Sequence, residues 1–73
     1  MKHINTAMVN WSVVCVNEFA RHKKLNPKAA FQYLHSFGGI QFIKEHYEVE
    51  HMLSLDNAID DLGIICRNNG GNL

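Results

Sequence analysis

RHKKLNPKAAFQYLHSFGG, residues 21–39, marks both ends of a helix. The side-chain oxygen of Asn26 suits an N-cap because it accepts hydrogen bonds from free amides of the first turn, and the fixed φ of Pro27 suits the first helical position. Gly38 and Gly39 are typical of the left-handed backbone that follows a helix. The stretch therefore predicts a helix that begins at Pro27 and ends before the two glycines. The residues expected to face inward are Ala30, Phe31, Leu34 and Phe37.

Another helix is predicted upstream, from Ile4 to His22, where apolar side chains recur at steps of three and four residues. Its stripe consists of Ile4, Met8, Trp11, Cys15 and Phe19, widened by Ala7, Val14 and Val16. The valine-rich run at 13–16 alone would suit a strand, but the helical pattern continues on both sides of it. We expect one long helix that ends in the basic cluster RHKK, because cations are favoured at the negative end of the helix dipole.

Two further helices are predicted downstream. The first runs from Ile40 to about Tyr47 and presents Ile40, Ile43 and Tyr47, with Phe42 outside this stripe. The second is capped by Ser54 or Asp56. Its stripe consists of Leu55, Ala58, Ile59, Leu62 and Cys66. Residues 48–53 fit either a helical or an extended conformation, and the turn-rich tail at 68–73 is expected to fray.

These patterns predict an all-α fold, a compact bundle of about four short helices in which the first is the longest. We expect a single domain over residues 1–73, because no repeat, linker or low-complexity segment divides the chain. A core this small supplies only about 3–5 kcal/mol of stability. We therefore expect the protein to gain stability by association, as a homo-oligomer or with a separate protein.

The charge balance and the cysteines narrow the classes of function. Seven Lys and Arg residues balance seven Asp and Glu residues, which argues against a nucleic-acid partner, since phosphate contacts need a basic surplus. Cys15 and Cys66 lie far apart among apolar neighbours and are interpreted as buried thiols. We expect a cytoplasmic protein without membrane contact, because we find neither an apolar leader nor a span of sufficient length.

The stretch EHYEVEH, residues 45–51, raises the question of a metal site. His46 and Glu50 would share one face of a helix, but the zinc-protease spacing H-E-x-x-H is absent. A metal site at His46, Glu50 and His51 is therefore the least favoured hypothesis, and a polar helix end is preferred. For His51 we also consider a half-buried ring bonded to a backbone carbonyl or to Asp60. With no catalytic motif present, we predict no enzyme activity, no cofactor and no metal.

The helices on either side of Gly38–Gly39 also fit a helix-turn-helix, which makes a DNA-binding regulator the alternative function. The residues offered to a DNA groove would be Gln41, Lys44 and His46, while Glu45 and Glu48 would face phosphate. The absent basic surplus weighs against this alternative.

Aromatic residues are numerous for so small a core, and Tyr33 and Phe42 fall outside the predicted stripes. One interpretation is that these rings are exposed for an interface. The other is that the predicted stripes are slightly out of register and the rings belong to the core. Both interpretations remain open.

The order of these features resembles a family of short bacterial proteins known only as domain of unknown function three-seven-nine-one. The similarity covers most of the chain, through the cap at 25–27, FGG, HYEVEHM and DNAIDDL. Tyr47, Glu48 and His51 match the family pattern, and Asp60-Asp61-Leu62 approximates a later Asp-Ile pair. Glu50 departs from it, standing where the family usually has leucine, and Met52-Leu53 replace a polar pair.

The resemblance implies a context rather than a mechanism. Members look to be encoded often beside a family resembling ADP-ribosyltransferases, which suggests an antidote-like or regulatory member of a bacterial two-gene system, similar to toxin–antitoxin pairs. The positions it singles out for testing are Tyr47, His51 and Asp61.

We therefore expect a non-enzymatic helical module for protein–protein interaction, which associates with itself or with a protein encoded nearby. The residues predicted as interaction candidates are Tyr33, Phe42, Tyr47, His51 and Asp61.

Overall fold

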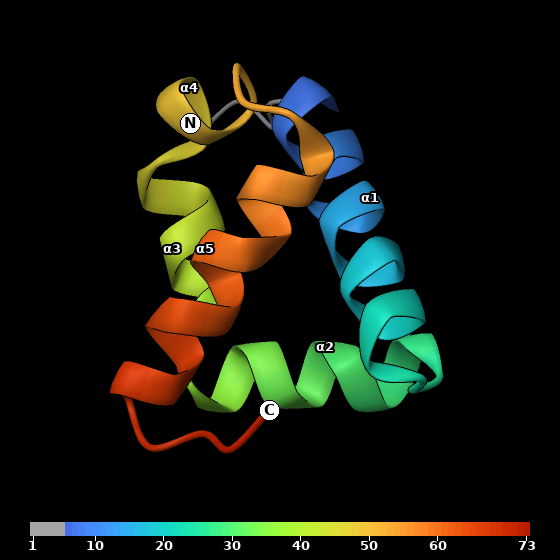
Figure 1. The fold of residues 1–73 in the computed structure, drawn as a ribbon. Coiled ribbons are helices and arrows are strands. Elements are labelled where there is room, and N and C mark those ends of the chain that lie inside the picture. The colour runs from blue at the N-terminus through green and yellow to red at the C-terminus, as the bar shows by residue number, and fades with distance from the viewer. Residues whose placement is uncertain (1–5) are drawn as a thin grey trace, which may run out of the picture.

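The computed structural model describes residues 6–73, and within this range the protein contains helices and no strands. The helices are α1 (Thr6–Lys23), α2 (Pro27–Ser36), α3 (Gly39–Glu45), α4 (Tyr47–Glu50) and α5 (Leu55–Asn68). In Figure 1, α2 crosses the lower end of α1, α3 rises beside the far end of α2, and α5 lies in front of α3. The prediction of an all-α fold with the first helix longest is confirmed.

The described part of the chain has five helices where we predicted about four. The extra helix is α4, a single turn that covers much of the segment left open between helical and extended. The backbone breaks at His46, with φ −119° and ψ 21°, so α3 ends at Glu45 instead of continuing to Tyr47. Residues 48–50 are therefore helical, and a turn at 51–54 leads into α5.

The predicted boundaries of α2 are confirmed. The Asn26 side-chain oxygen accepts a hydrogen bond from the Ala29 amide at 2.7 Å, and Pro27 is the first helical residue. Beyond Ser36, Gly38 adopts the left-handed conformation with φ 82°. Ser54, not Asp56, caps α5, since its hydroxyl accepts from the Asn57 amide at 3.2 Å. Local sequence signals thus set these helix ends.

The core lies where α1, α2, α3 and α5 meet. Its buried apolar residues are Cys15, Phe19, Ala20, Ala30, Leu34, Ile43, Ile59, Leu62 and Cys66. This confirms most of the predicted stripes, although Ala7 and Val14 are exposed and Ile4 lies outside the described residues. Both cysteines are free and buried, as predicted. Burial, with a smaller contribution from Glu50, raises the pKa of the Cys15 thiol to about 12.

Phe31 is the clearest error in the predicted stripes. We expected it to face inward, but its side chain is 47% exposed. Ala30 and Leu34 are spaced four apart and face the core, so Phe31 lies about 100° further round α2. Tyr33 and Phe42 are partly buried and pack against the core, which supports the interpretation that the predicted stripes are slightly out of register over the interpretation that these rings are exposed.

The C-terminal tail is held in place, whereas we expected it to fray. The Gly71 amide donates to the Cys66 carbonyl at 2.8 Å, and the Leu73 amide donates to the Tyr33 hydroxyl at 3.0 Å. The Asn69 side-chain amide also donates to the Phe37 carbonyl at 2.9 Å. These bonds connect the tail to both α2 and α5.

Within residues 6–73, no helix combines the length and the apolar character needed to cross a membrane.

Candidate functional site

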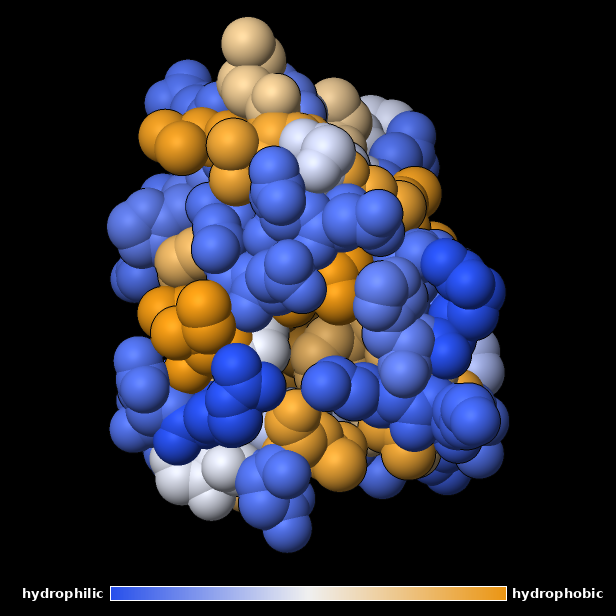
Figure 2. Space-filling model, in the orientation of Figure 1, coloured by the Kyte–Doolittle hydropathy of each residue, from blue (hydrophilic) through white to orange (hydrophobic). Residues whose placement is uncertain are grey.

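An open apolar groove of about 550 Å³ lies between α1, α2 and α3. The residues that line it are Met8, Val9, Ser12, Val13, Val16, Phe31, His35, Ile40 and Lys44. None of these nine residues belongs to α5. The face that carries α5 shows mainly hydrophilic side chains with small separate apolar patches (Figure 2).

The groove exists because α1 and α2 carry apolar side chains outside their core stripes. Val9 and Val13 are four residues apart on α1 and are 48% and 53% exposed. Phe31 on α2 stacks on His35, with ring centroids 5.9 Å apart. Exposed apolar side chains gathered around one hollow are typical of a surface that binds another molecule. We did not single out Val9 and Val13 from the sequence, although both valines lie beside the predicted stripe of α1.

The ionisable side chains among the nine lining residues are His35 and Lys44, and both are basic types. A neighbouring hollow of about 290 Å³ begins beyond Lys44 and is lined also by Met8, Glu45, Tyr47 and Glu48. The groove itself is therefore apolar with a basic edge, and acidic residues lie outside its end.

The structure brings together two of the positions that the family resemblance singled out. The rings of Tyr47 and His51 stack with centroids 4.4 Å apart, and His51 Nδ1 hydrogen-bonds to the Tyr47 carbonyl oxygen at 2.6 Å. Of the partners considered for His51, a backbone carbonyl is thus the one observed, not Asp60. The ring is exposed and not half-buried, and its bond stays within the α4 turn, so it does not tie the turn to α5.

The third of these positions, Asp61, lies on α5 beside Glu50. Glu50 is only 7% exposed, and its Oε1 atom has no hydrogen-bond partner. Burial raises its pKa to about 7, and the Asp61 carboxyl adds to the shift through a hydrogen bond and through charge repulsion. A buried acid of this kind is costly when ionised. One indication of this burial was present in the sequence, because Glu50 stands where the resembling family usually has leucine. We nevertheless interpreted Glu50 as part of a polar helix end.

The remaining interaction candidates lie in internal contacts. The ring of Tyr33 is packed between Phe19 and Phe37, with centroid distances of 5.7 and 4.9 Å. Phe42 packs against the core and contacts the His46 ring at 4.8 Å. Their role in binding stays a prediction, whereas Val9, Val13 and Phe31 offer far more accessible apolar surface.

The helix-turn-helix alternative gains no support from these contacts. Gln41 donates to the Glu45 carboxylate at 2.8 Å, and the His46 ring contacts the Phe42 ring in a tilted arrangement, so two of the three residues offered to DNA are held locally. Helix α3 is also only seven residues long.

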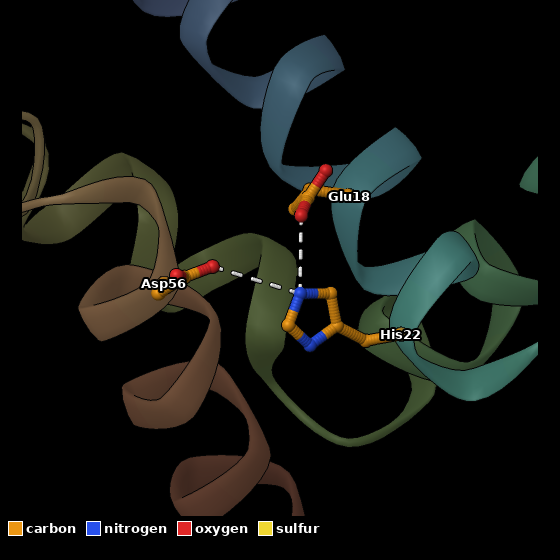
Figure 3. Close-up of side chains that lie close together, drawn as sticks. All are labelled: Glu18, His22 and Asp56. Atoms are coloured by element: carbon orange, nitrogen blue, oxygen red, sulfur yellow. Dashed lines mark hydrogen bonds and ion pairs between the residues drawn. The ribbon is translucent and has the colours of Figure 1, made fainter.

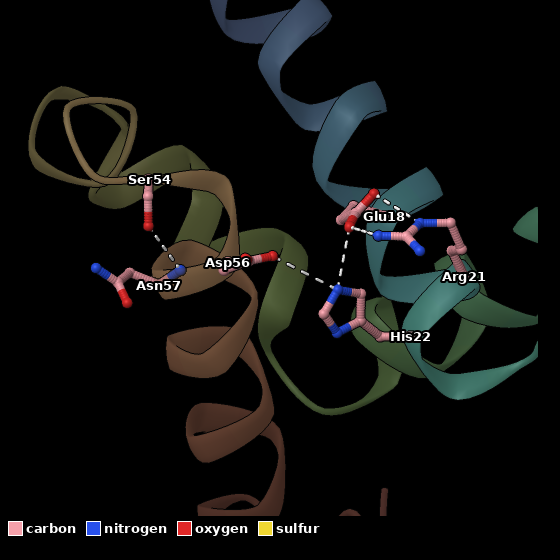
Figure 4. A network of polar contacts seen from close by, with 6 residues as sticks. All are labelled: Glu18, Arg21, His22, Ser54, Asp56 and Asn57. Carbon is pink, nitrogen blue, oxygen red and sulfur yellow. Dashed lines mark hydrogen bonds and ion pairs between the residues drawn. The ribbon is translucent and has the colours of Figure 1, made fainter.

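A group of possible metal ligands occurs at a place that the sequence did not indicate. Within residues 6–73, the side chains that come close enough to share one metal ion are those of Glu18, His22 and Asp56. The predicted set of His46, Glu50 and His51 does not form such a group. Glu18 also pairs with Arg21, as Figure 4 shows.

The comparison with known proteins assigns a family. The family described as protein of unknown function (DUF3791) matches residues 10–69. The chain belongs to this family. No curated protein and no solved structure matches the chain. The DUF3791 match includes α2, α3, α4 and α5 completely, together with most of α1, so it contains all of the groove residues except Met8 and Val9.

Proposed function

We propose that this DUF3791 chain is a non-enzymatic module that binds an amphipathic helix of another protein in the groove between α1, α2 and α3. The observation that carries the proposal is the exposure of Val9, Val13 and Phe31 around one apolar hollow. Covering such surface releases about 25 cal/mol for each Å² of apolar area removed from water.

The apolar walls of the groove suit a helix. Its volume of about 550 Å³ leaves room for inserted side chains, since pockets that bind whole small molecules have roughly 300–1,000 Å³. A helix that binds in a groove inserts apolar anchors spaced three, four and seven residues apart. The walls come from three helices with Phe31 and Ile40 on one side and the valines of α1 on the other, so such anchors meet apolar side chains on both sides.

The charged residues at the groove indicate which kind of partner helix would bind there. Lys44 and His35 stand at the groove with no acidic side chain among its nine lining residues, so acidic residues that flank the anchors of the partner would be complementary. A second copy that used the same groove would bring the same basic residues to the interface. We therefore favour a different protein as the partner over the homo-oligomer that we also predicted from the sequence.

A protein encoded nearby would supply this helix, and the family resemblance suggests an ADP-ribosyltransferase-like protein. In that arrangement the chain is the antidote-like or regulatory member of a bacterial two-gene system in the cytoplasm. A Cys15 pKa of about 12 makes a thiolate nucleophile at this position unfavourable, so we assign no catalytic role to Cys15.

The proposal is tested by fluorescence anisotropy with a labelled synthetic amphipathic helix that has leucine anchors and flanking glutamates. A twin peptide with lysine in place of each glutamate is the charge control. We expect the acidic peptide to bind more tightly than its twin, and Val13→Glu to weaken this binding roughly tenfold or more. Val14→Glu is the matched control, because Val14 is 43% exposed on the same helix but does not line the groove.

Equal binding by the two variants would contradict the groove as the site. Light scattering adds a second test. If the wild-type protein is a dimer that Val13→Glu dissociates, the groove binds a second copy, and the choice of a different protein as partner is wrong.

A further inference from the structure

Glu18, His22 and Asp56 converge where the end of α1 meets the start of α5. Glu18 and His22 are one helical turn apart on α1, and Asp56 belongs to the first turn of α5. His22 Nε2 lies 3.0 Å from Glu18 Oε2 and 3.7 Å from Asp56 Oδ1, and the three candidate ligand atoms lie within 4.8 Å of one another. Figure 3 shows the three side chains pointing toward a common point.

We propose that Glu18, His22 and Asp56 bind a divalent cation of the zinc class. Imidazole nitrogen and carboxylate oxygen are both zinc ligands, and ligand atoms in a tetrahedral zinc site are about 3.4 Å apart. The two measured separations from His22 lie on either side of this value. Calcium and magnesium fit less well, because they prefer sites made of oxygen ligands alone.

The surroundings leave room for the cation and for its remaining ligand. Asp56 is 80% exposed, so a hydrated cation reaches the site without any opening of the fold. A hollow of about 300 Å³ beside the site is lined by His22 and Asp60 and also by the basic residues Lys23 and Arg67, so the cation would lie outside it. Because Asp56 is exposed to solvent, a water molecule is expected as the fourth ligand, as is common where a protein supplies three.

Arg21 favours cation binding in one respect and competes with the cation in another. Its Nε donates to Glu18 Oε1 at 3.2 Å and its Nη2 donates to Oε2, which lowers the pKa of Glu18 and keeps the carboxylate ionised. The same pairing occupies an oxygen that the cation would use. Binding therefore involves a shift of this carboxylate, and we expect an affinity well below that of a closed structural zinc site.

Binding at this place has a structural consequence that is independent of the groove. None of the three ligands lines the groove, and the cation would connect two helices whose ends are far apart in sequence. A ligand that binds only the folded state stabilises it. The cation should therefore raise the melting temperature of the protein.

Isothermal titration calorimetry with zinc chloride on the intact, chelator-treated protein tests the proposal. We expect binding in the wild type that His22→Ala weakens roughly tenfold or more, since a three-ligand site loses its only nitrogen. His35→Ala is the control, because His35 is also exposed but lies on α2 at the groove. Absence of binding in the wild type, or equal affinity in the two variants, would overturn the proposal.

A melting experiment gives a second and separate readout. Zinc chloride should raise the melting temperature of the wild type and not that of Asp56→Asn, which keeps a side chain of the same shape at an exposed position. An equal rise in both proteins would show that Asp56 is not a ligand and that the site is not the one proposed.

Discussion

Glu50 on α4 places its buried carboxyl group beside that of Asp61 on α5. Two neighbouring carboxyl groups, one of them buried, cannot both be ionised without a cost. The pKa of Glu50 is accordingly raised from 4.5 to about 7, first by burial and then by Asp61. The Glu50 charge also adds, after burial, to the raised pKa of Cys15 on α1.

Stability is therefore predicted to fall as pH rises through neutrality. The folded state holds the Glu50 proton more tightly than the unfolded state, so its full stability contribution is present below pH 4.5 and is lost as pH rises through about 7. Since one pKa unit corresponds to about 1.4 kcal/mol, we expect a loss of the order of 2 kcal/mol between pH 5 and pH 8. Urea unfolding at these two pH values measures it.

Glu50→Gln should make the stability less dependent on pH, and the exposed Glu48→Gln on the same helix should not. The lowered pKa of Glu18 acts in the opposite direction, but its effect belongs to the range below pH 4.5. Apart from the substituted glutamate, the two variants have the same ionisable groups, so the difference between the two substitutions isolates Glu50. The same pH slope in both would show that Glu50 is not the responsible group.

Removal of the α2 cap should cost about 1 kcal/mol. In Asn26→Ala the Ala29 amide loses its acceptor, and caps of this kind contribute about 0.5–2 kcal/mol. Asn17→Ala is the control, because Asn17 is exposed in the interior of α1. Thermal unfolding of the two variants compares them, and equal melting temperatures would argue against the role of the cap.

The helix ends that depend on the local backbone and most of the core stripes were predicted correctly from the sequence, but the environments of Glu50 and Phe31 were not. Asn26, Pro27 and Gly38 define the ends of α2 through their own conformational preferences, so their signals are local. The burial of Glu50 and the exposure of Phe31 depend on how the helices cross, which no local pattern contains. The site was missed for the same reason, because the groove is formed by faces of three separate helices.

Tyr33→Phe is predicted to release the end of the tail while leaving the core intact. The substitution removes the hydroxyl that accepts from the Leu73 amide, but it keeps the ring between Phe19 and Phe37. Hydrogen exchange should show faster exchange of the Leu73 amide, with a loss of about 1 kcal/mol or less in overall stability.

The Gly71 amide serves as the internal reference in this experiment, because it donates to the Cys66 carbonyl and not to Tyr33. Unchanged exchange at Leu73 would mean that the tail is held without the hydroxyl.

The groove between α1, α2 and α3 is tested most directly by nuclear magnetic resonance, in which the acidic amphipathic peptide is titrated into isotope-labelled protein. We expect the largest chemical-shift changes at Val9, Val13, Phe31 and Ile40. Ile64 on α5, which is exposed to the same degree as Val9 but lies outside the groove, should change little. Shifts centred on α5, or no shifts at all, would contradict the account.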